Sequence, residues 1–190
     1  MKFLALSGSL RQDAYSTLLA RSAVELAPDG VEVTLFDGLH SIPGFNQDLE
    51  SEGVPTPVED LRRQIEEADA LLVVTPEYNA SVPGALKNAI DWASRPNGSS
   101  ALMGKPAAIV SSSPSPFGGA WANQHVRKVF SITGTPVVET ELAIGKADRK
   151  LSPEGKLVDP DTRGRMSSLL LELEELADQV SQAELEELAA

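Results

Sequence analysis

Short apolar runs alternate along the chain with longer segments in which apolar residues recur every three or four positions. The runs are nearly continuous in apolar character, as in strands that are buried on both faces. They predict strands at residues 2–7, 31–36, 70–75 and 106–111, with a fifth near 136–140 or slightly later. The segments between them have the spacing of helices.

Helices are expected at residues 17–26, 58–68, 82–92 and 120–132. A last helix follows from an apolar stripe at Met166, Leu169, Leu170, Leu173, Ala177 and Val180. Between the second strand and the second helix lies a long segment rich in Gly and Pro, and residues 151–158 read as a short hairpin or an ordered loop.

This order predicts a single α/β domain over residues 1–190, a doubly wound five-stranded parallel sheet with helices on both faces. Parallel strands need crossover connections, and helices supply them. Ligands of such sheets bind beyond the carboxyl ends of the strands. The loops at 8–16, 76–81 and 111–119 are therefore the places to look for chemistry.

Composition narrows the possible functions. The chain has no cysteine, so any redox chemistry needs a bound cofactor. A net charge of −12 argues against nucleic-acid binding, although seven of the 28 acids lie in residues 167–190, which contain no Lys or Arg. The apolar N-terminal run is too short for a signal sequence or a membrane span, so we expect no membrane partner and a cytoplasmic location.

The loop at residues 8–16 carries groups that suit a phosphate. Ser9, Arg11 and Ser16 supply hydroxyls and a guanidinium beside the N–H groups of a helix start. Alternatively, the serines only cap the helix and Arg11 is solvated. The motifs G-x-x-x-x-G-K-[ST], G-x-G-x-x-G and G-x-S-x-G are absent, so a P-loop kinase, a Rossmann dehydrogenase and an α/β hydrolase are not indicated.

The loop after the third strand carries the most specific motif, Pro76-Glu77-Tyr78-Asn79. As an ordinary turn it would place Asn79 in the left-handed region and leave Tyr78 half-buried. The motif also resembles the Pro-Glu-Tyr-Asn segment of the NADPH-dependent FMN reductase family, flavodoxin-like quinone, azo-dye and chromate reductases. Gly8-Ser9-Leu10-Arg11 and the serine-rich loop after the fourth strand extend the resemblance in element order over nearly the whole chain.

The resemblance implies a flavodoxin-like fold that binds FMN and uses NAD(P)H to pass two electrons to a quinone or another small oxidant. It implies that Ser9, Arg11 and Ser16 hold the phosphate, and that Pro76, Glu77, Tyr78, Asn79 and Ser112 contact the flavin. Backbone N–H groups of residues 77–79 and 112–113 are expected at its polar edge. No catalytic acid or base and no metal ligand is expected, because the cofactor carries the chemistry.

Two other functions stay open: a flavodoxin-like electron carrier and a flavin-free binding scaffold. The resemblance also implies a homodimer or homotetramer, to which an apolar helical surface around Trp92 is a possible contributor. The acidic last helix is read as a solvated face, with an interaction role as the alternative. His40 and His125 are assigned no role.

The chain departs from the family pattern in two places. Where the family reads Ser-Leu-Arg-x-x-Ser-aromatic-Asn, this chain has Ala14 in place of the second serine, Ser16 in place of the asparagine, and an additional carboxylate at Asp13. After the glycine pair at 118–119 the family has Arg, and this chain has Trp121. We expect Trp121 to be a buried structural indole, with stacking on a ligand or a partner subunit as the alternative.

Overall fold

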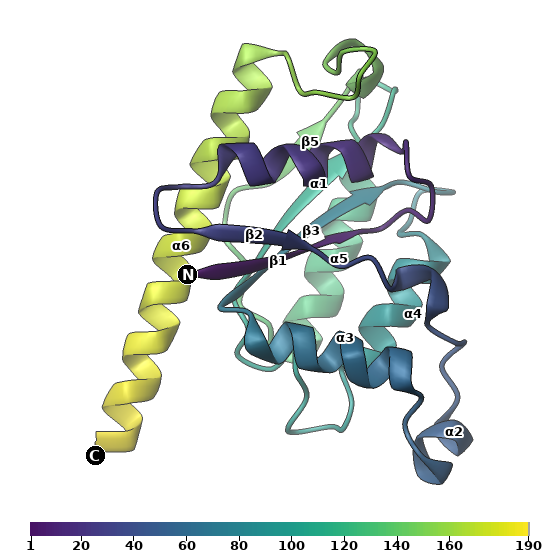
Figure 1. The fold of residues 1–190 in the computed structure, drawn as a ribbon, viewed down its shortest axis with the longest axis vertical. Helices are drawn as coiled ribbons and strands as arrows, with labels where there is room; N and C mark the ends of the chain where they lie inside the picture. The colour runs from purple at the N-terminus through teal and green to yellow at the C-terminus, as the bar shows by residue number, and fades with distance from the viewer. Residues whose placement is uncertain (190) are drawn as a thin grey trace.

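In the computed structural model, which describes residues 1–189, five parallel strands form one sheet in the order β2-β1-β3-β4-β5 (Figure 1). The strands are β1 (Lys2–Ser7), β2 (Glu32–Leu35), β3 (Ala70–Pro76), β4 (Ala107–Ser112) and β5 (Leu142–Ile144). The predicted α/β class and the parallel sheet are confirmed. The fifth strand lies slightly later than 136–140, where Val137 makes only an isolated parallel bridge to Ala107.

Six α-helices and two short 3₁₀ helices connect and cover these strands within the described residues. They are α1 (Tyr15–Leu26), η1 (Leu39–Ser41), α2 (Gln47–Glu52), α3 (Thr56–Glu67), α4 (Gly84–Ala93), α5 (Ala120–Thr133), η2 (Ala147–Arg149) and α6 (Pro160–Ala189). The predicted hairpin at 151–158 is confirmed by an antiparallel bridge between Leu151 and Leu157.

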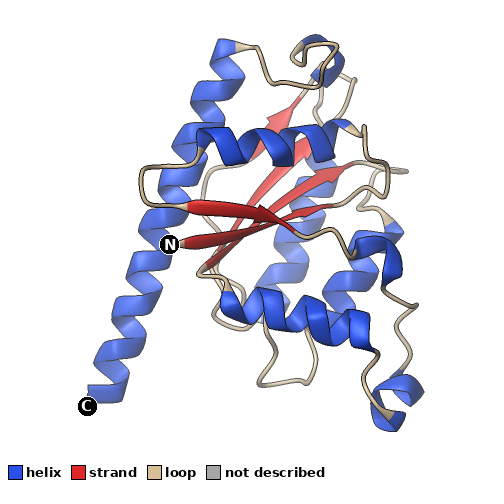
Figure 2. Ribbon diagram, viewed as in Figure 1, coloured by secondary structure: helices blue, strands red, loops and turns tan. Residues whose placement is uncertain are grey.

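The sheet is the middle of three layers (Figure 2). Side chains from alternate strand positions pack on one face against α1 and α6, around Phe3, Leu72 and Val110. The remaining positions pack on the other face against α3, α4 and α5, around Leu71, Ile109 and other buried residues. Because both faces of the sheet are covered, the strands need apolar residues at successive positions, as their sequences show.

The long connection between β2 and α3 is tied down onto α4. Trp92 Nε1 donates to the Pro43 carbonyl at 2.8 Å, and Asn88 bonds both Pro43 O and the Phe45 N–H. Trp92 is fully buried and its ring meets Phe45 edge to face at 4.9 Å between centroids. The expectation of an apolar contact surface around Trp92 is therefore wrong, because this connection covers the indole.

Helix α6 runs beside the sheet, and its C-terminal half extends past the other elements (Figure 1). Its buried residues include Met166, Leu169, Leu173 and Ala177, from the predicted stripe. Among the described residues, no helix combines the length and the apolar character needed to cross a membrane.

Candidate functional site

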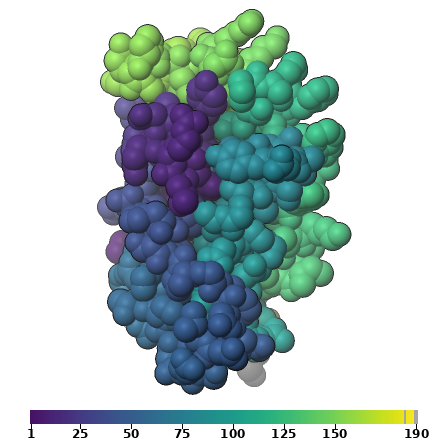
Figure 3. All heavy atoms as spheres, turned by 90° about the vertical axis from the view of Figure 1, so that its right-hand side faces the viewer, coloured from purple at the N-terminus to yellow at the C-terminus, as the bar shows by residue number. Residues whose placement is uncertain are grey.

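The carboxyl ends of the strands bring the predicted loops together on one face, which is turned toward the viewer in Figure 3. Strand register pairs Pro76 at the end of β3 with Ser112 at the end of β4. The N–H of Gly8, just past β1, donates to Val74 O at 2.8 Å, so the first loop starts beside the end of β3. Residues far apart in sequence thus meet at one edge of the sheet.

The first loop is held from inside by hydroxyls. Ser7 Oγ lies 2.8 Å from Thr17 Oγ1 and 3.4 Å from the Oγ of Ser16, which is fully buried. Thr17 Oγ1 donates to Arg11 O, and Ser9 Oγ accepts the Arg11 N–H at 3.2 Å. These bonds fix the path of the loop and leave the Arg11 side chain exposed, with no ion pair in the described chain.

The start of α1 presents free backbone donors. Ala14 occupies the N-cap, no side chain caps the helix, and the first turn contains no acid. The first N–H groups of a helix lack intrahelical acceptors and lie at the positive end of its dipole. In the described chain this end remains available to an anion, as a phosphate site requires.

Residues 78–81 form a tight hairpin. Tyr78 and Ser81 exchange both backbone hydrogen bonds, at 3.0 and 3.1 Å. The two residues between them, Asn79 and Ala80, have φ values of 52° and 58°. Positive φ at both central positions defines a type I′ turn, in which alanine is strained. The expected left-handed Asn79 is confirmed, and Tyr78 is 48% exposed.

Glu77 joins this hairpin to α5. Its Oε2 accepts the N–H groups of Trp121 at 3.0 Å and Ala122 at 3.2 Å, which caps the helix. The close approach depends on Gly119, whose φ is 77° and whose added Cβ would lie 3.3 Å from Glu77 Cβ. Farther along α5, His125 Nδ1 lies 3.0 Å from Ser81 Oγ. The hairpin is therefore attached to α5 at both ends.

Two buried hydroxyls near the end of β4 have no protein partner. Ser111 Oγ and Ser112 Oγ make no hydrogen bond to any described residue, although both side chains are buried. A buried hydroxyl without a partner costs about 1–3 kcal/mol, so such groups point to a missing ligand or water. Successive side chains of a strand point to opposite faces of the sheet, so the two serine hydroxyls lie in different surroundings.

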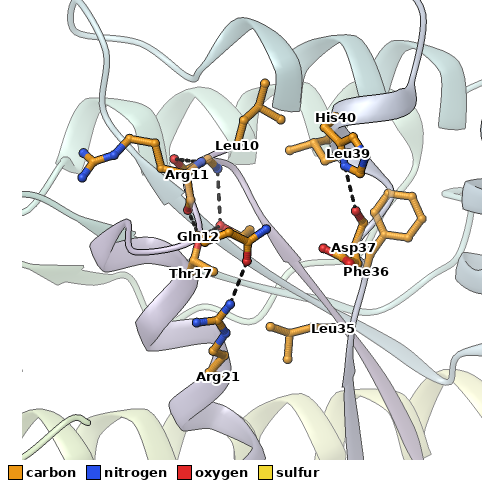
Figure 4. A pocket seen from close by; sticks show the side chains of 12 residues that line it. Leu10, Arg11, Gln12, Thr17, Arg21, Leu35, Phe36, Asp37, Leu39 and His40 are labelled. Atoms are coloured by element: carbon orange, nitrogen blue, oxygen red, sulfur yellow. Dashed lines mark hydrogen bonds between the residues drawn. The ribbon is translucent and has the colours of Figure 1, made fainter. Parts of the chain in front are cut away.

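A pocket of about 430 Å³ opens at the carboxyl ends of β1 and β2 (Figure 4). One wall is the first loop with Leu10 and Gln12, together with Thr17 of α1, and the other is the segment after β2 with Phe36, Asp37 and His40. Arg21 projects from α1, and its Nη2 donates to Gln12 Oε1 at 2.8 Å. The Arg11 side chain extends away from the wall that carries Phe36 (Figure 4).

The predicted site residues fall into two groups. Ser9 and Arg11 line the pocket, with Ser16 buried behind them. Pro76, Glu77, Tyr78, Asn79 and Ser112 lie at the ends of β3 and β4 and do not line it. The Glu77 carboxylate is engaged on α5 through its Oε2 atom. Each role in cofactor binding stays a prediction.

Two expectations about this region need correction. Trp121 is 59% exposed, so it is not a buried structural indole: its backbone meets Glu77 while its ring faces outward from the first turn of α5. Of the backbone donors expected at the flavin edge, the Tyr78 N–H already bonds Ser81 O and the Ser113 N–H bonds Ile144 O. These two N–H groups are satisfied by the protein itself.

Sequence reasoning missed Thr17 and the segment after β2. Thr17 lies one position beyond the inspected loop, and its hydroxyl holds that loop in place. Phe36, Asp37 and His40 follow β2 at the same edge of the sheet as the other loops. The rule that ligands bind beyond strand ends applies to β2 as well, and would have pointed to them.

The parallel sheet order, the anion-ready start of α1 and the unsatisfied serines define a flavodoxin-like α/β protein with a ligand site at the carboxyl edge. Comparison with known proteins identifies the family within this fold class. Residues 1–149 match the model of the NADPH-dependent FMN reductase family, and the chain belongs to that family.

Similar proteins agree with this assignment. The chain is 42% identical to an NAD(P)H-dependent FMN reductase of Pseudomonas aeruginosa, over 86% of this chain and 88% of that protein. It is 36% identical to a quinone reductase of Escherichia coli K12, over 95% and 97% of the two chains. Among solved structures, the flavoenzyme NAD(P)H:(acceptor) oxidoreductase FerB of Paracoccus denitrificans superposes with a TM-score of 0.82 at 32% identity, covering 95% of this chain and 97% of that one.

Proposed function

We propose that this chain is an FMN-dependent enzyme that transfers two electrons from NAD(P)H to a quinone or another small oxidant. The observation that carries the proposal is the set of unsatisfied polar groups gathered at one edge of the sheet. The uncapped start of α1 suits a phosphate, and the Ser112 hydroxyl beside Pro76 lacks a partner. Membership in the FMN reductase family supports FMN as the ligand of this edge.

The residues present fit FMN. Ser9, Arg11, Ser16 and the first N–H groups of α1 would hold the phosphate, with Ser16 acting through its backbone because its side chain is buried. Pro76, Tyr78, Asn79, the Glu77 backbone and the Ser112 hydroxyl would contact the ring. When bound, FMN accepts hydride from NAD(P)H and supplies the electrons for the acceptor.

The protein's own contribution is positioning. The hairpin that carries Tyr78 and Asn79 is fixed by the Glu77 carboxylate at one end and the Ser81–His125 contact at the other. A rigid support of this kind holds a ring in one orientation at low entropic cost. No side chain is assigned a proton-transfer role, because hydride and electron transfer at the flavin do not require one.

The proposal has a direct test in two measurements. Purified protein is expected to show flavin absorption and to release FMN on denaturation. Steady-state oxidation of NADPH or NADH with a quinone acceptor is then expected to proceed through many turnovers. A fully FMN-loaded protein without turnover would favour a flavodoxin-like carrier, and a protein that takes up no FMN would favour the scaffold.

We further propose a single flavodoxin-like domain that acts in the cytoplasm as a homodimer or homotetramer. The five strands belong to one sheet, which supports the single domain. Phe117 and Trp121 are 78% and 59% exposed beside the candidate site, which favours a contact between subunits there. Light scattering of the eluting protein would give the subunit number, and a monomer would contradict the assembly.

A further inference from the structure

The start of α1 offers a phosphate backbone groups more than side chains. Ala14 at the N-cap has no hydroxyl, and Ser16 is fully buried with its Oγ 3.4 Å from Ser7 Oγ. The donors that remain at this helix end are the backbone N–H groups of residues 15–17, which lack intrahelical acceptors. Backbone donors point where the path of the chain directs them, so the groups that fix this path control the phosphate site.

One fixed point of the path is the entry from β1. The Gly8 N–H donates to Val74 O at 2.8 Å, and a Cβ added to Gly8 would lie 2.8 Å from Thr75 Oγ1 and 3.2 Å from Thr75 Cα. Glycine is therefore required at this position, and the loop begins in close contact with β3. Beyond Gly8, the path depends on hydrogen bonds formed inside the loop.

Hydroxyl groups supply these bonds, and the direction of each bond follows from the acceptors. A carbonyl oxygen can only accept, so the Thr17 hydroxyl donates its single proton to Arg11 O at 3.0 Å (Figure 4). Thr17 Oγ1 then accepts the proton of Ser7 Oγ, 2.8 Å away. With its own proton used, Ser7 Oγ accepts from the Ser9 N–H at 3.3 Å and from the Ser16 hydroxyl. We call this series of bonds through Ser7 and Thr17 the hydroxyl chain.

The hydroxyl chain joins three elements beneath the loop. Ser7 ends β1, Thr17 lies in the first turn of α1, and Arg11 lies in the loop between them. Arg11 O also accepts the Ala14 N–H at 3.3 Å, so both lone pairs of this oxygen are used within the protein. A carbonyl turned outward at the start of α1 would repel a phosphate. The hydroxyl chain therefore keeps this acceptor inside the loop and leaves the donor end of the helix to the anion.

The hydroxyl chain is shielded from water, since Thr17 is 7% and Ser9 8% exposed. In such surroundings a hydrogen bond is stronger than in water, and a buried hydroxyl that loses its partner carries a desolvation cost. Removing one hydroxyl would leave its neighbour unpaired and would let the loop take other paths before a ligand arrives. Preorganised donors bind a ligand more tightly, because less order has to be created on binding.

We propose that Ser7 and Thr17 are positioning residues for the phosphate of FMN. Their hydroxyls are used inside the protein, and they act by holding the loop and the first turn of α1 in the arrangement that binds the anion. The inference rests on the proposed function, which supplies FMN as the ligand. Its consequence is selective: the two hydroxyls raise the affinity for FMN but not for riboflavin, which has the same ring without the phosphate.

Fluorescence titration of the flavin-free, full-length protein with FMN and, separately, with riboflavin tests this role. Thr17→Val keeps the shape of the side chain and removes the hydroxyl. We expect it to weaken FMN binding about tenfold, the loss of one hydrogen bond, and riboflavin binding by less than about twofold. Thr17→Ser, which restores the hydroxyl, is expected to recover most of the FMN affinity. The control is Ser22→Ala, which removes a buried hydroxyl bonded to Leu18 O in the same helix and is expected to change neither affinity.

Combining two changes tests whether the hydroxyls act as one chain. Ser7→Ala is expected to weaken FMN binding about as much as Thr17→Val, and the double variant little more than either, since each change breaks the same chain. Losses that multiply in the double variant would contradict the chain. A loss in Thr17→Val with none in Ser7→Ala would make Thr17 a direct ligand of the phosphate and would overturn its positioning role.

Equal losses of FMN and riboflavin affinity in Thr17→Val would also overturn the proposal, because they would show a general effect on the fold. Unchanged FMN affinity in this variant, or a wild type that binds the two flavins equally, would do the same. All these results are compatible with NAD(P)H oxidation by the FMN-loaded wild type. In contrast, a selective loss of FMN affinity in Thr17→Val, in a protein without turnover, would contradict the proposed function alone. A wild type that binds neither flavin would contradict both.

Discussion

The Oε2 atom of Glu77 lies 3.0 Å from the backbone nitrogen of Trp121, so a side chain at the end of β3 caps the first turn of α5. A carboxylate at this position also meets the positive end of the helix dipole. The motif residue expected to touch the flavin thus acts on the protein through its side chain. Glu77 would affect the cofactor indirectly, through the position in which it holds Tyr78 and Asn79.

Glu77→Ala is expected to lower the free energy of unfolding by about 1–2 kcal/mol, the usual cost of a lost helix cap. Glu77→Gln keeps an acceptor and is expected to cost less, because only the charge–dipole attraction disappears. Urea denaturation of the flavin-free protein measures both. Glu139→Ala, which removes an exposed carboxylate with no capping role, serves as the control. Equal stabilities of Glu77→Ala and the control would refute the cap.

Ala80 offers a test of the type I′ turn. At a φ of 58° its Cβ costs about 1 kcal/mol, and glycine removes that strain while it gains a similar amount of unfolded-state entropy. Ala80→Gly is therefore expected to change the free energy of unfolding by less than about 0.5 kcal/mol, unlike most alanine-to-glycine changes. Ala80→Val is expected to destabilise by about 1–2 kcal/mol, since a β-branched residue fits poorly at positive φ. Thermal unfolding of both variants measures these changes in the free energy of unfolding.

Ser112→Ala is expected to weaken FMN binding about tenfold, the loss of one buried hydrogen bond to the ligand. The stability of the flavin-free protein is not expected to fall, because the hydroxyl has no partner there. Ser111→Ala is the matched control, one residue earlier in β4 and facing the other side of the sheet. Fluorescence titration with FMN gives the affinities, and an unchanged affinity in Ser112→Ala would remove it from the site.

Charge at the first loop is expected to set the affinity for the phosphate. Arg11→Ala should weaken FMN binding about ten- to a hundredfold, the loss of a charged hydrogen bond. Asp13→Asn should tighten it severalfold, because it removes a negative charge beside the phosphate. Arg149→Ala, a change at an exposed arginine on η2, is the comparison in the same titration. Tighter binding by Arg11→Ala would show that the phosphate lies elsewhere.

Glu50 should make stability depend on pH at the acidic end. The Arg95 guanidinium at 2.9 Å, together with Arg62 at 3.2 Å, holds the pKa of Glu50 below its ordinary value. Ionised Glu50 therefore stabilises the fold above its unfolded pKa of about 4.3, and this contribution is lost as the pH falls through the lower folded value. Glu50→Gln is expected to cost about 1–2 kcal/mol at pH 7.

The check on Glu50 is a comparison across pH. The difference in unfolding free energy between wild type and Glu50→Gln should shrink as the pH falls below about 4. A difference that stays constant from pH 7 to pH 3 would show that the two arginines do not depend on the carboxylate charge.

The alternation of apolar runs and helical spacing was enough to predict the sheet, because a parallel strand covered on both faces must be apolar at successive positions. β3 and β4 show this most clearly, and both were predicted within a residue of their ends. β5 was placed only approximately, since its three residues carry little pattern and Val137 nearby mimics a strand.

The site was predictable to the level of loops but not of side chains. Ser9, Arg11 and Pro76 could be found because each follows a strand that the pattern identifies. The cap formed by Glu77 could not, because it joins residues 44 positions apart and depends on how α5 approaches β3. For the same reason, the spacing of residues in the sequence could not show that the Pro43 segment covers Trp92. Nor could it show that Trp121 is exposed.

The two outer strands, β2 and β5, have only four and three residues. An outer strand exposes N–H and C=O groups that can recruit a strand from another chain, and short ones offer few of them. Side chains such as Glu32 and Thr34 on β2 are exposed and polar, which discourages such pairing further. Any assembly of copies of this chain would therefore use side-chain packing and would not extend one sheet across subunits. The same short, polar edges also protect a concentrated solution against ordered aggregation.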